Sequence, residues 1–121
     1  MLEPIKLEPT KHTFHINIKA ESVENDIINP LSVGDINADM FEIFLNDCGR
    51  EADLSDTTVI VSVVRPDGSV VPLPADVDGS TIRVTLDRFC YELPGRITLK
   101  VKLQGANFMR QVLAVGMNVI S

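Results

Sequence analysis

The stretch from Thr57 to Leu103 constrains the fold most, because strand-forming runs and turn signals alternate along it. It opens with the β-branched run Thr57–Arg65 and then passes through Pro66-Asp67-Gly68. Proline, aspartate and glycine in this order suit a type I turn followed by a left-handed glycine, which closes a β-hairpin. The stretch therefore predicts a hairpin at the centre of a β-domain.

Apolar side chains recur at every second position elsewhere in the chain, as half-buried strands require. These positions are Phe14, Ile16 and Ile18; Phe41, Ile43 and Leu45; Ile82, Val84 and Leu86; and Ile97, Leu99, Val101 and Leu103. A last strand is expected over Phe108–Ile120, with Gly116 as a bulge. By contrast, the acidic segment Glu21–Asn29 is expected to be irregular.

Glycine and proline mark the breaks between these strands. We expect turns centred on Gly34-Asp35, on Gly49 at a positive-φ position, and on Val77–Ser80. Pro72 and Pro74 are expected to stop regular pairing, because neither has an N–H group to donate.

Residues 87–93 lose the period of two, although strands precede and follow them. Asp87 is a favourable N-cap, and Phe89 and Leu93 are four residues apart, so they would share one helical face. Pro94 then ends the element. The pattern predicts one or two helical turns that cross the end of a sheet.

Short strands with a turn signal roughly every ten residues predict an all-β fold. We expect an antiparallel immunoglobulin-like β-sandwich with one short helix near residues 87–93. A length of 121 residues predicts one domain with a self-sufficient core. Residues 1–10, which include Pro4 and Pro9, are expected to form an N-terminal arm, and residues 11–121 the single sandwich domain.

The formal net charge of -6 disfavours two classes of partner. Binding to nucleic acid requires a positive field around the phosphates, and anionic membrane surfaces require the same. No apolar run approaches the roughly 20 residues that span a bilayer. We therefore expect neither nucleic acid nor a membrane as a partner.

The compartment is predicted from the N-terminus and the cysteines. Residues 1–11 lack the apolar core of a signal peptide, so nothing indicates Sec export. Cys48 and Cys90 lie outside any CxxC motif, which predicts free thiols made in a reducing compartment, with Cys90 packed against the core.

Two candidate metal sites fail on spacing. His12 and His15 are three residues apart, which on a strand places them on opposite faces, and we expect both at the surface. The loop Asp76–Ser80 resembles a calcium loop, but Gly79 stands at the fourth position instead of the sixth. An Asx-type turn is favoured there, and no metal or cofactor is expected.

No catalytic constellation is visible. Five carboxylates could cluster in space, but nothing gives them the unlike environments that acid–base catalysis needs. They are Glu21, Glu24, Asp26, Asp35 and Asp39. No serine lies in a GxSxG elbow, and no glycine-rich phosphate loop is present. The five phenylalanines are scattered, so core packing is expected for each: Phe14, Phe41, Phe44, Phe89 and Phe108. We therefore expect a protein that is not an enzyme.

From Val33 onward, the order of motifs resembles the N-terminal domain family of phage baseplate upper proteins. The resemblance covers about 90 residues, and its specificity lies in order and spacing. The segments that carry it are Gly34-Asp35, Phe41–Leu45, Asn46–Leu54, Val61–Gly68, Leu93–Ile97 and Phe108–Ile120.

The resemblance implies a structural, cofactor-free β-sandwich in a phage or prophage tail. Such a domain attaches peripheral receptor-binding parts to the baseplate core, so its partners would be other tail proteins, and a homo-oligomer is compatible with that role. Its location would be the virion, after synthesis in the bacterial cytoplasm. The alternative is an immunoglobulin-like adhesion or carbohydrate-binding module of a bacterial surface protein. The sequence leaves the partner interface unknown.

Overall fold

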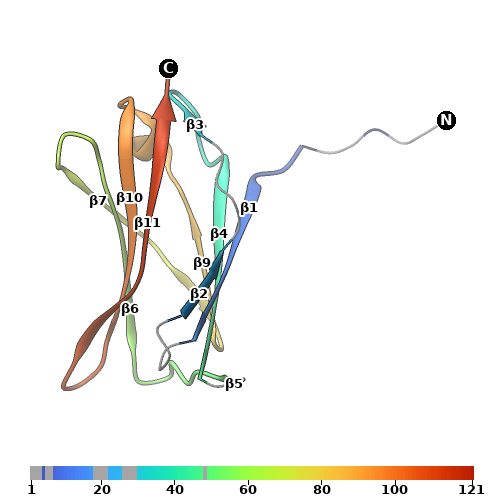
Figure 1. The fold of residues 1–121 in the computed structure, drawn as a ribbon, viewed down its shortest axis with the longest axis vertical. Helices are drawn as coiled ribbons and strands as arrows, with labels where there is room; N and C mark the ends of the chain where they lie inside the picture. The colour runs from blue at the N-terminus through green and yellow to red at the C-terminus, as the bar shows by residue number, and fades with distance from the viewer. Residues whose placement is uncertain (1–3, 5–6, 18–21, 26–29, 48) are drawn as a thin grey trace.

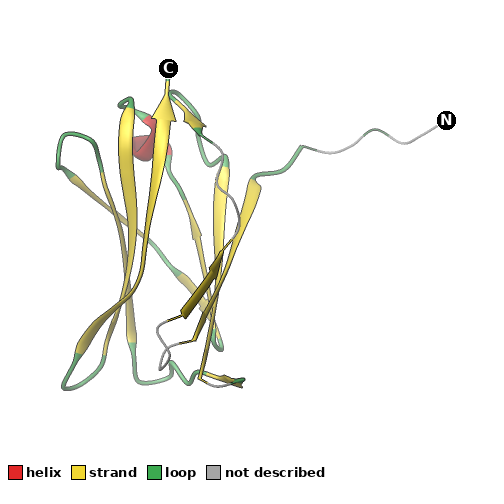
Figure 2. Ribbon diagram, viewed as in Figure 1, coloured by secondary structure: helices red, strands yellow, loops and turns green. Residues whose placement is uncertain are grey.

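Two β-sheets stack face to face in the computed structural model, which describes residues 4, 7–17, 22–25, 30–47 and 49–121 (Figures 1 and 2). The first sheet contains β1 (Thr10–Asn17), β2 (Ser22–Asn25), β4 (Asp39–Asp47), β5 (Arg50–Glu51), β8 (Asp76–Asp78) and β9 (Thr81–Thr85). The second contains β3 (Leu31–Ser32), β6 (Thr58–Val64), β7 (Val70–Leu73), β10 (Gly95–Gln104) and β11 (Met109–Ile120). The expectation of an all-β fold is confirmed.

The core lies between the two sheets and is built from the alternating positions. Leu99 and Ile43 lie on the middle strands of the two sheets, and both are fully buried. Every predicted inward position in the described residues is buried; Ile18 lies outside them. Each such side chain contributes about 1.5–3 kcal/mol by leaving water, so this alternation holds the sandwich together.

The hairpin predicted at Pro66-Asp67-Gly68 joins β6 to β7. The Gly68 N–H donates to the Arg65 carbonyl at 2.9 Å, and the Arg65 N–H donates to the Ser69 carbonyl at 2.8 Å. Gly68 has φ 87°, the left-handed conformation that only glycine adopts readily. The turn is confirmed, and it fixes Val64 opposite Val70.

The link predicted over residues 87–93 forms a 3₁₀ helix, η1 (Arg88–Tyr91), at one end of the sandwich (Figure 2). The Asp87 carboxylate caps it by accepting from the Phe89 N–H at 2.9 Å. Cys90 is buried, as expected, but Phe89 is 44% exposed and Tyr91 is fully buried in its place. The prediction that Phe89 and Leu93 share one helical face was wrong, because η1 is too short to form an α-helical face.

The sandwich is not wholly antiparallel. β1 pairs with β4 in parallel, with Phe14 opposite Ile43, and β3 pairs with β11 in parallel. Parallel neighbours need a long crossover, and residues 18–38 supply one between β1 and β4. The expectation of antiparallel pairing holds for the other strand pairs described and fails for these two.

Two local predictions about strand pairing also need correction. Ser22–Asn25 was expected to be irregular but forms β2, which pairs with β1. Pro72 does not stop pairing: it lies inside β7, opposite Ser62. β7 is an edge strand, so the missing N–H costs no ladder bond.

The bulge in β11 is not at Gly116, which pairs regularly with Thr98. The register shifts where Val101 faces Leu113 but Lys102 faces Gln111, so Val112 is the extra residue.

The turn after β3 also differs from the prediction by one residue. The Asp35 N–H donates to the Ser32 carbonyl at 3.2 Å, which centres the turn on Val33-Gly34.

Candidate functional site

Three buried polar side chains meet near the end of the sandwich that carries η1. His12 on β1 donates from Nε2 to the Asp39 carboxylate at 2.8 Å, and the Tyr91 hydroxyl donates to the other carboxylate oxygen at 2.8 Å. His12 and Asp39 are each 5% exposed, and Tyr91 is 0% exposed. A carboxylate only accepts, so both of its oxygens are satisfied by donors from distant parts of the chain.

The same residues anchor the surrounding backbone. The Leu86 N–H donates to the Asp39 carbonyl at 3.0 Å, and the Gly34 N–H donates to the Tyr91 carbonyl at 3.2 Å. The His12 ring packs on Phe41, with centroids 4.9 Å apart. The network therefore joins β1, β4, η1 and the turn after β3.

The surface position expected for His12 was wrong. It shares the inward face of β1 with Phe14 and Ile16, and its burial is tolerated because Asp39 accepts a hydrogen bond from its N–H group. His15 is exposed as expected, and its ring stacks on Phe44 at 5.0 Å. The two imidazoles lie on opposite faces of β1, as the spacing predicted.

The network lacks the parts of a nucleophilic site. Such a site needs a hydroxyl or thiol on the second imidazole nitrogen and room for a substrate. No hydroxyl or thiol is hydrogen-bonded to that nitrogen in the described part of the chain, and all three side chains are buried. The hydrogen bonds of this network connect four segments of the chain, and we assign the network the role of stabilising their packing.

Burial, assisted by the hydrogen bond to Asp39, raises the pKa of the Tyr91 hydroxyl well above its usual value. In the unfolded chain this group ionises near pH 10, so the folded state alone keeps the proton above that pH. Stability should therefore be unaffected below about pH 10 and fall as the pH rises further. Tyr91 is the only tyrosine, so tyrosinate absorbance reports it alone. We expect ionisation to coincide with alkaline unfolding; ionisation in the folded protein near pH 10 would contradict the burial.

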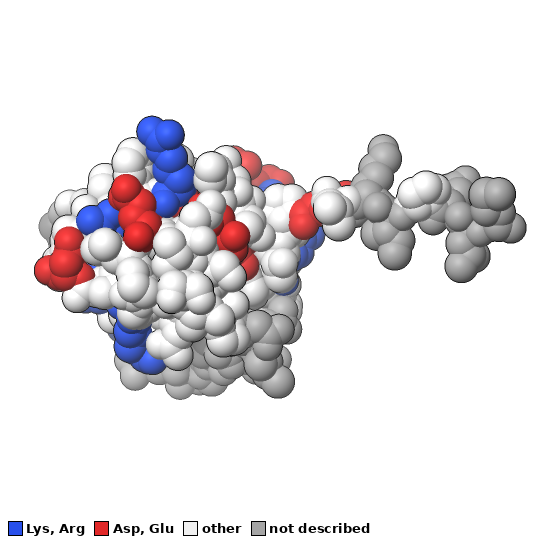
Figure 3. All heavy atoms as spheres, turned by 90° about the horizontal axis from the view of Figure 1, so that it is seen from above, with Lys and Arg blue, Asp and Glu red and all other residues white. Residues whose placement is uncertain are grey.

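A second polar cluster surrounds the hairpin at the same end. Arg65 donates to Glu92 Oε1 at 2.7 Å, to the Phe89 carbonyl at 3.2 Å and to Ser69 Oγ at 2.8 Å. The cluster fastens the β6–β7 hairpin to η1, and acidic and basic side chains lie interspersed on this end (Figure 3). Hydrogen bonds from the Ser69 side chain and main chain lower the pKa of Asp67.

Cys90 lies beneath this cluster. Burial, and then the nearby Asp87, raises the pKa of its thiol to about 12. A thiol with this pKa is protonated at neutral pH and is a poor nucleophile. Cys90 is thus a core side chain, whereas Cys48 lies outside the described residues.

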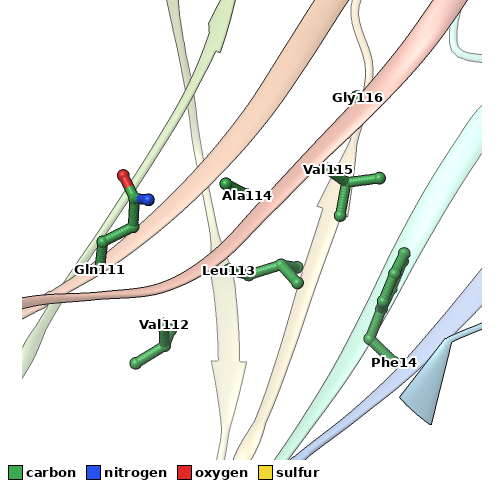
Figure 4. A pocket seen from close by; sticks show the side chains of 7 residues that line it. All are labelled: Phe14, Gln111, Val112, Leu113, Ala114, Val115 and Gly116. Carbon is green, nitrogen blue, oxygen red and sulfur yellow. The ribbon is translucent and has the colours of Figure 1, made fainter. Parts of the chain in front are cut away.

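Two hollows in the described surface are lined mainly by apolar side chains. One, of about 430 Å³, lies at the end opposite η1, where the β10–β11 turn meets residues 52–57. Phe108 and Met109, 57% and 56% exposed, form its rim, and Leu54 and Leu103 its floor. The other, of about 490 Å³, lies between β1 and β11, where Leu113 and Val115 point toward Phe14 (Figure 4). Asp53 and Arg110 are the ionisable residues that line the first hollow, and the lining of the second contains none.

The other candidate residues are placed as follows. Asp76–Ser80 is the β8–β9 hairpin, with Gly79 at φ 61° at the first central position. Asp39 is buried, Asp35 lies on the turn after β3, and Glu21, Asp26 and the side chain of Glu24 lie outside the described set. No group of three or more His, Cys, Asp or Glu side chains among the described residues is placed to hold a metal.

Sequence reasoning missed Tyr91 and Arg65 as organising residues. Tyr91 had no period to reveal its burial, and Arg65 gains its partners from a segment 24–27 residues away. One signal was available: His12 is separated from Phe14 and Ile16 by even numbers of residues, which indicates that its side chain also points inward.

Phe89 and Phe108 were expected in the core and are exposed. No described helix is long and apolar enough to cross a membrane.

The structure is a two-sheet β-sandwich in which buried polar groups join segments that are distant in the chain. Comparison with solved structures finds the N-terminal domain of phage TP901-1 ORF48, which aligns over 92% of this chain and 97% of that chain. The sequence identity is 12% and the TM-score 0.52, so the likeness is one of fold. The expected resemblance is confirmed at that level. No known protein family matches the chain, and neither does any curated protein.

Proposed function

We propose that this chain is a non-enzymatic docking domain of a phage or prophage tail baseplate. It links peripheral receptor-binding parts to the baseplate core through protein–protein contacts, it uses no cofactor, and its location is the virion. Residues 1–10 serve as an arm and residues 11–121 as the docking domain. Contacts between copies of the chain are compatible with this role.

The observation that carries the proposal is the fold likeness to a phage protein domain over nearly the full length of both chains. The ordered motifs from Gly34 to Ile120 support it independently, because their order and spacing are properties of the sequence and do not depend on the fold comparison. The buried network adds a physical argument. A domain that connects other proteins needs a rigid structure, and buried hydrogen bonds such as those to Asp39 stabilise a single packing arrangement.

Docking requires exposed apolar surface, and the hollow rimmed by Phe108 and Met109 supplies it at the end opposite η1. Aromatic and methionine side chains are enriched where protein interfaces become fully buried. We propose that this rim contacts the baseplate core.

The test is reconstitution with the tail proteins encoded beside this chain, followed by mass photometry and calorimetry. We expect the wild-type chain to join their complex, and Phe108→Glu to weaken binding at least about tenfold, because a charge would be buried at the contact. Phe89→Glu is the matched control: the same change at a 44% exposed phenylalanine at the other end, with binding unchanged. A chain that binds none of these proteins would refute the docking role, and equal loss in both variants would refute the rim.

The carbohydrate-binding alternative gains no support. Sugar platforms use aromatic rings side by side, and Phe89 and Phe108 precede and follow β10, a ten-residue strand. A strand of that length separates them by roughly 30 Å.

A further inference from the structure

The second sheet carries cations and no carboxylate. Of the 17 acidic residues in the chain, none lies in β3, β6, β7, β10 or β11. The same strands hold Arg96, Lys100, Lys102 and Arg110. For a chain with net charge -6, this separation leaves one face of the sandwich positive.

Three of these cations form a column on the outer face of β10. Arg96, Lys100 and Lys102 alternate with the fully buried Ile97, Leu99 and Val101, so they point away from the core. The flanking strands present short or apolar side chains beside them. Ser62 and Ala114 lie opposite Lys100, and Ile60, which is 37% exposed, lies opposite Lys102.

The column is flat as well as positive. A Cβ at Gly116 would stand 2.0 Å from a guanidinium nitrogen of Arg96, so Arg96 lies across the sheet surface over this glycine. In the first sheet, by contrast, Arg83 and Lys11 both contact Glu42. No ion pair within the described residues involves Arg96, Lys100, Lys102 or Arg110. Their charges are available to a partner.

The chain itself has a surface of matching charge and spacing. β8 is an edge strand of the first sheet, and its residues Asp76, Val77 and Asp78 are all exposed. Asp76 and Asp78 are two residues apart on one strand, as are Lys100 and Lys102, so each pair is separated by roughly 7 Å. Asp78 reaches Arg83 only at 3.8 Å and stays 79% exposed.

We propose that the face formed by Arg96, Lys100 and Lys102 binds β8 of a second copy of this chain. Asp76 and Asp78, which share one face of β8, pair with Lys100 and Lys102. The two surfaces differ, so the contact is heterologous and propagates into a ring or a stack. The proposal stands on charge placement alone and is independent of the baseplate role.

The test is analytical ultracentrifugation of the full chain and four double variants at low and high salt. The wild type should self-associate at about 20 mM NaCl and dissociate at about 500 mM, because salt screens exposed pairs. Lys100→Glu/Lys102→Glu and Asp76→Lys/Asp78→Lys should each be monomeric, and an equimolar mixture of the two should associate again. Arg50→Glu/Arg88→Glu and Glu51→Lys/Asp56→Lys change the net charge equally at other exposed positions, and both should behave as wild type.

Restored association in the mixture would establish the contact, because each variant alone has like charges on both surfaces, and only the mixture brings surfaces of opposite charge together. A wild type that stays monomeric up to about millimolar concentration at low salt would overturn the proposal. So would a mixture that stays monomeric. Self-association that survives the Asp76→Lys/Asp78→Lys change would exclude β8 as the occupant.

Discussion

Asp39→Ala should lower the free energy of unfolding by about 3–5 kcal/mol, because it leaves two buried donors without an acceptor. The His12 Nε2–H and the Tyr91 hydroxyl both donate to this carboxylate, and neither side chain is more than 5% exposed. For a chain of this size the melting temperature should fall by roughly 10–20 °C. Thermal and urea denaturation followed by circular dichroism measure both quantities.

Two further variants separate the network from the mere loss of a side chain. Tyr91→Phe removes one donor and leaves one carboxylate oxygen free, so we expect a loss of about 1–2 kcal/mol. Asp35→Ala, on the neighbouring turn, removes an identical side chain outside the network and should change stability by less than about 0.5 kcal/mol. If Asp39→Ala lowered the free energy of unfolding no more than Asp35→Ala does, the network would not stabilise the fold.

The parts of the fold that the sequence predicted are those decided locally. The Pro66-Asp67-Gly68 turn depends on three residues, and the alternation from Ile97 to Leu103 depends on one strand packing on one core. Asp87 caps η1 through an N–H only two residues away. In each case the residues that determine the conformation are neighbours in the chain, so their order is sufficient evidence.

The parts that were missed depend on partners far away in the chain. The parallel pairing of β1 with β4 follows from where residues 18–38 return the chain, and no local pattern encodes that. The sequence predicts a surface position for His12 because its acceptor, Asp39, is 27 residues away. It predicts a break at Pro72 because the local sequence does not show whether a strand lies at the edge or in the centre of a sheet. The buried network could not be predicted for the same reason, because its three residues come from three separate elements.

The cation column shows how a pattern can be present in the sequence yet acquire meaning only from topology. Lys100 and Lys102 read as the polar side of an alternating strand, which is the ordinary solvated arrangement. The sheet order shows that the strands on both sides of β10, β6 and β11, contain no carboxylate. The lack of carboxylates beside β10 is a property of the assembled sheet, and it becomes visible only when the strands next to β10 are known.

Gly95→Ala is expected to be the second most damaging substitution, with a loss of about 2–5 kcal/mol. Gly95 begins β10 at φ 129°, where a residue with a Cβ is strained by about 1–3 kcal/mol. The new Cβ would also lie 3.0 Å from Cβ and Cγ of Pro66. The proline ring is rigid and sits in the hairpin turn that Arg65 fastens to η1, so overpacking adds a further cost of about 1–3 kcal/mol.

Gly34→Ala is the matched control for Gly95→Ala, because Gly34 has φ 91° and nothing lies within 4 Å of the added Cβ. It should therefore show the backbone strain without the steric overlap. Both variants are measured by urea denaturation, and the difference between their unfolding free energies isolates the contact with Pro66. A Gly95→Ala/Pro66→Ala double variant should recover part of that difference, since the smaller residue leaves room for the methyl group. If the two glycine variants were equally stable, the β6–β7 turn would not be packed against the start of β10.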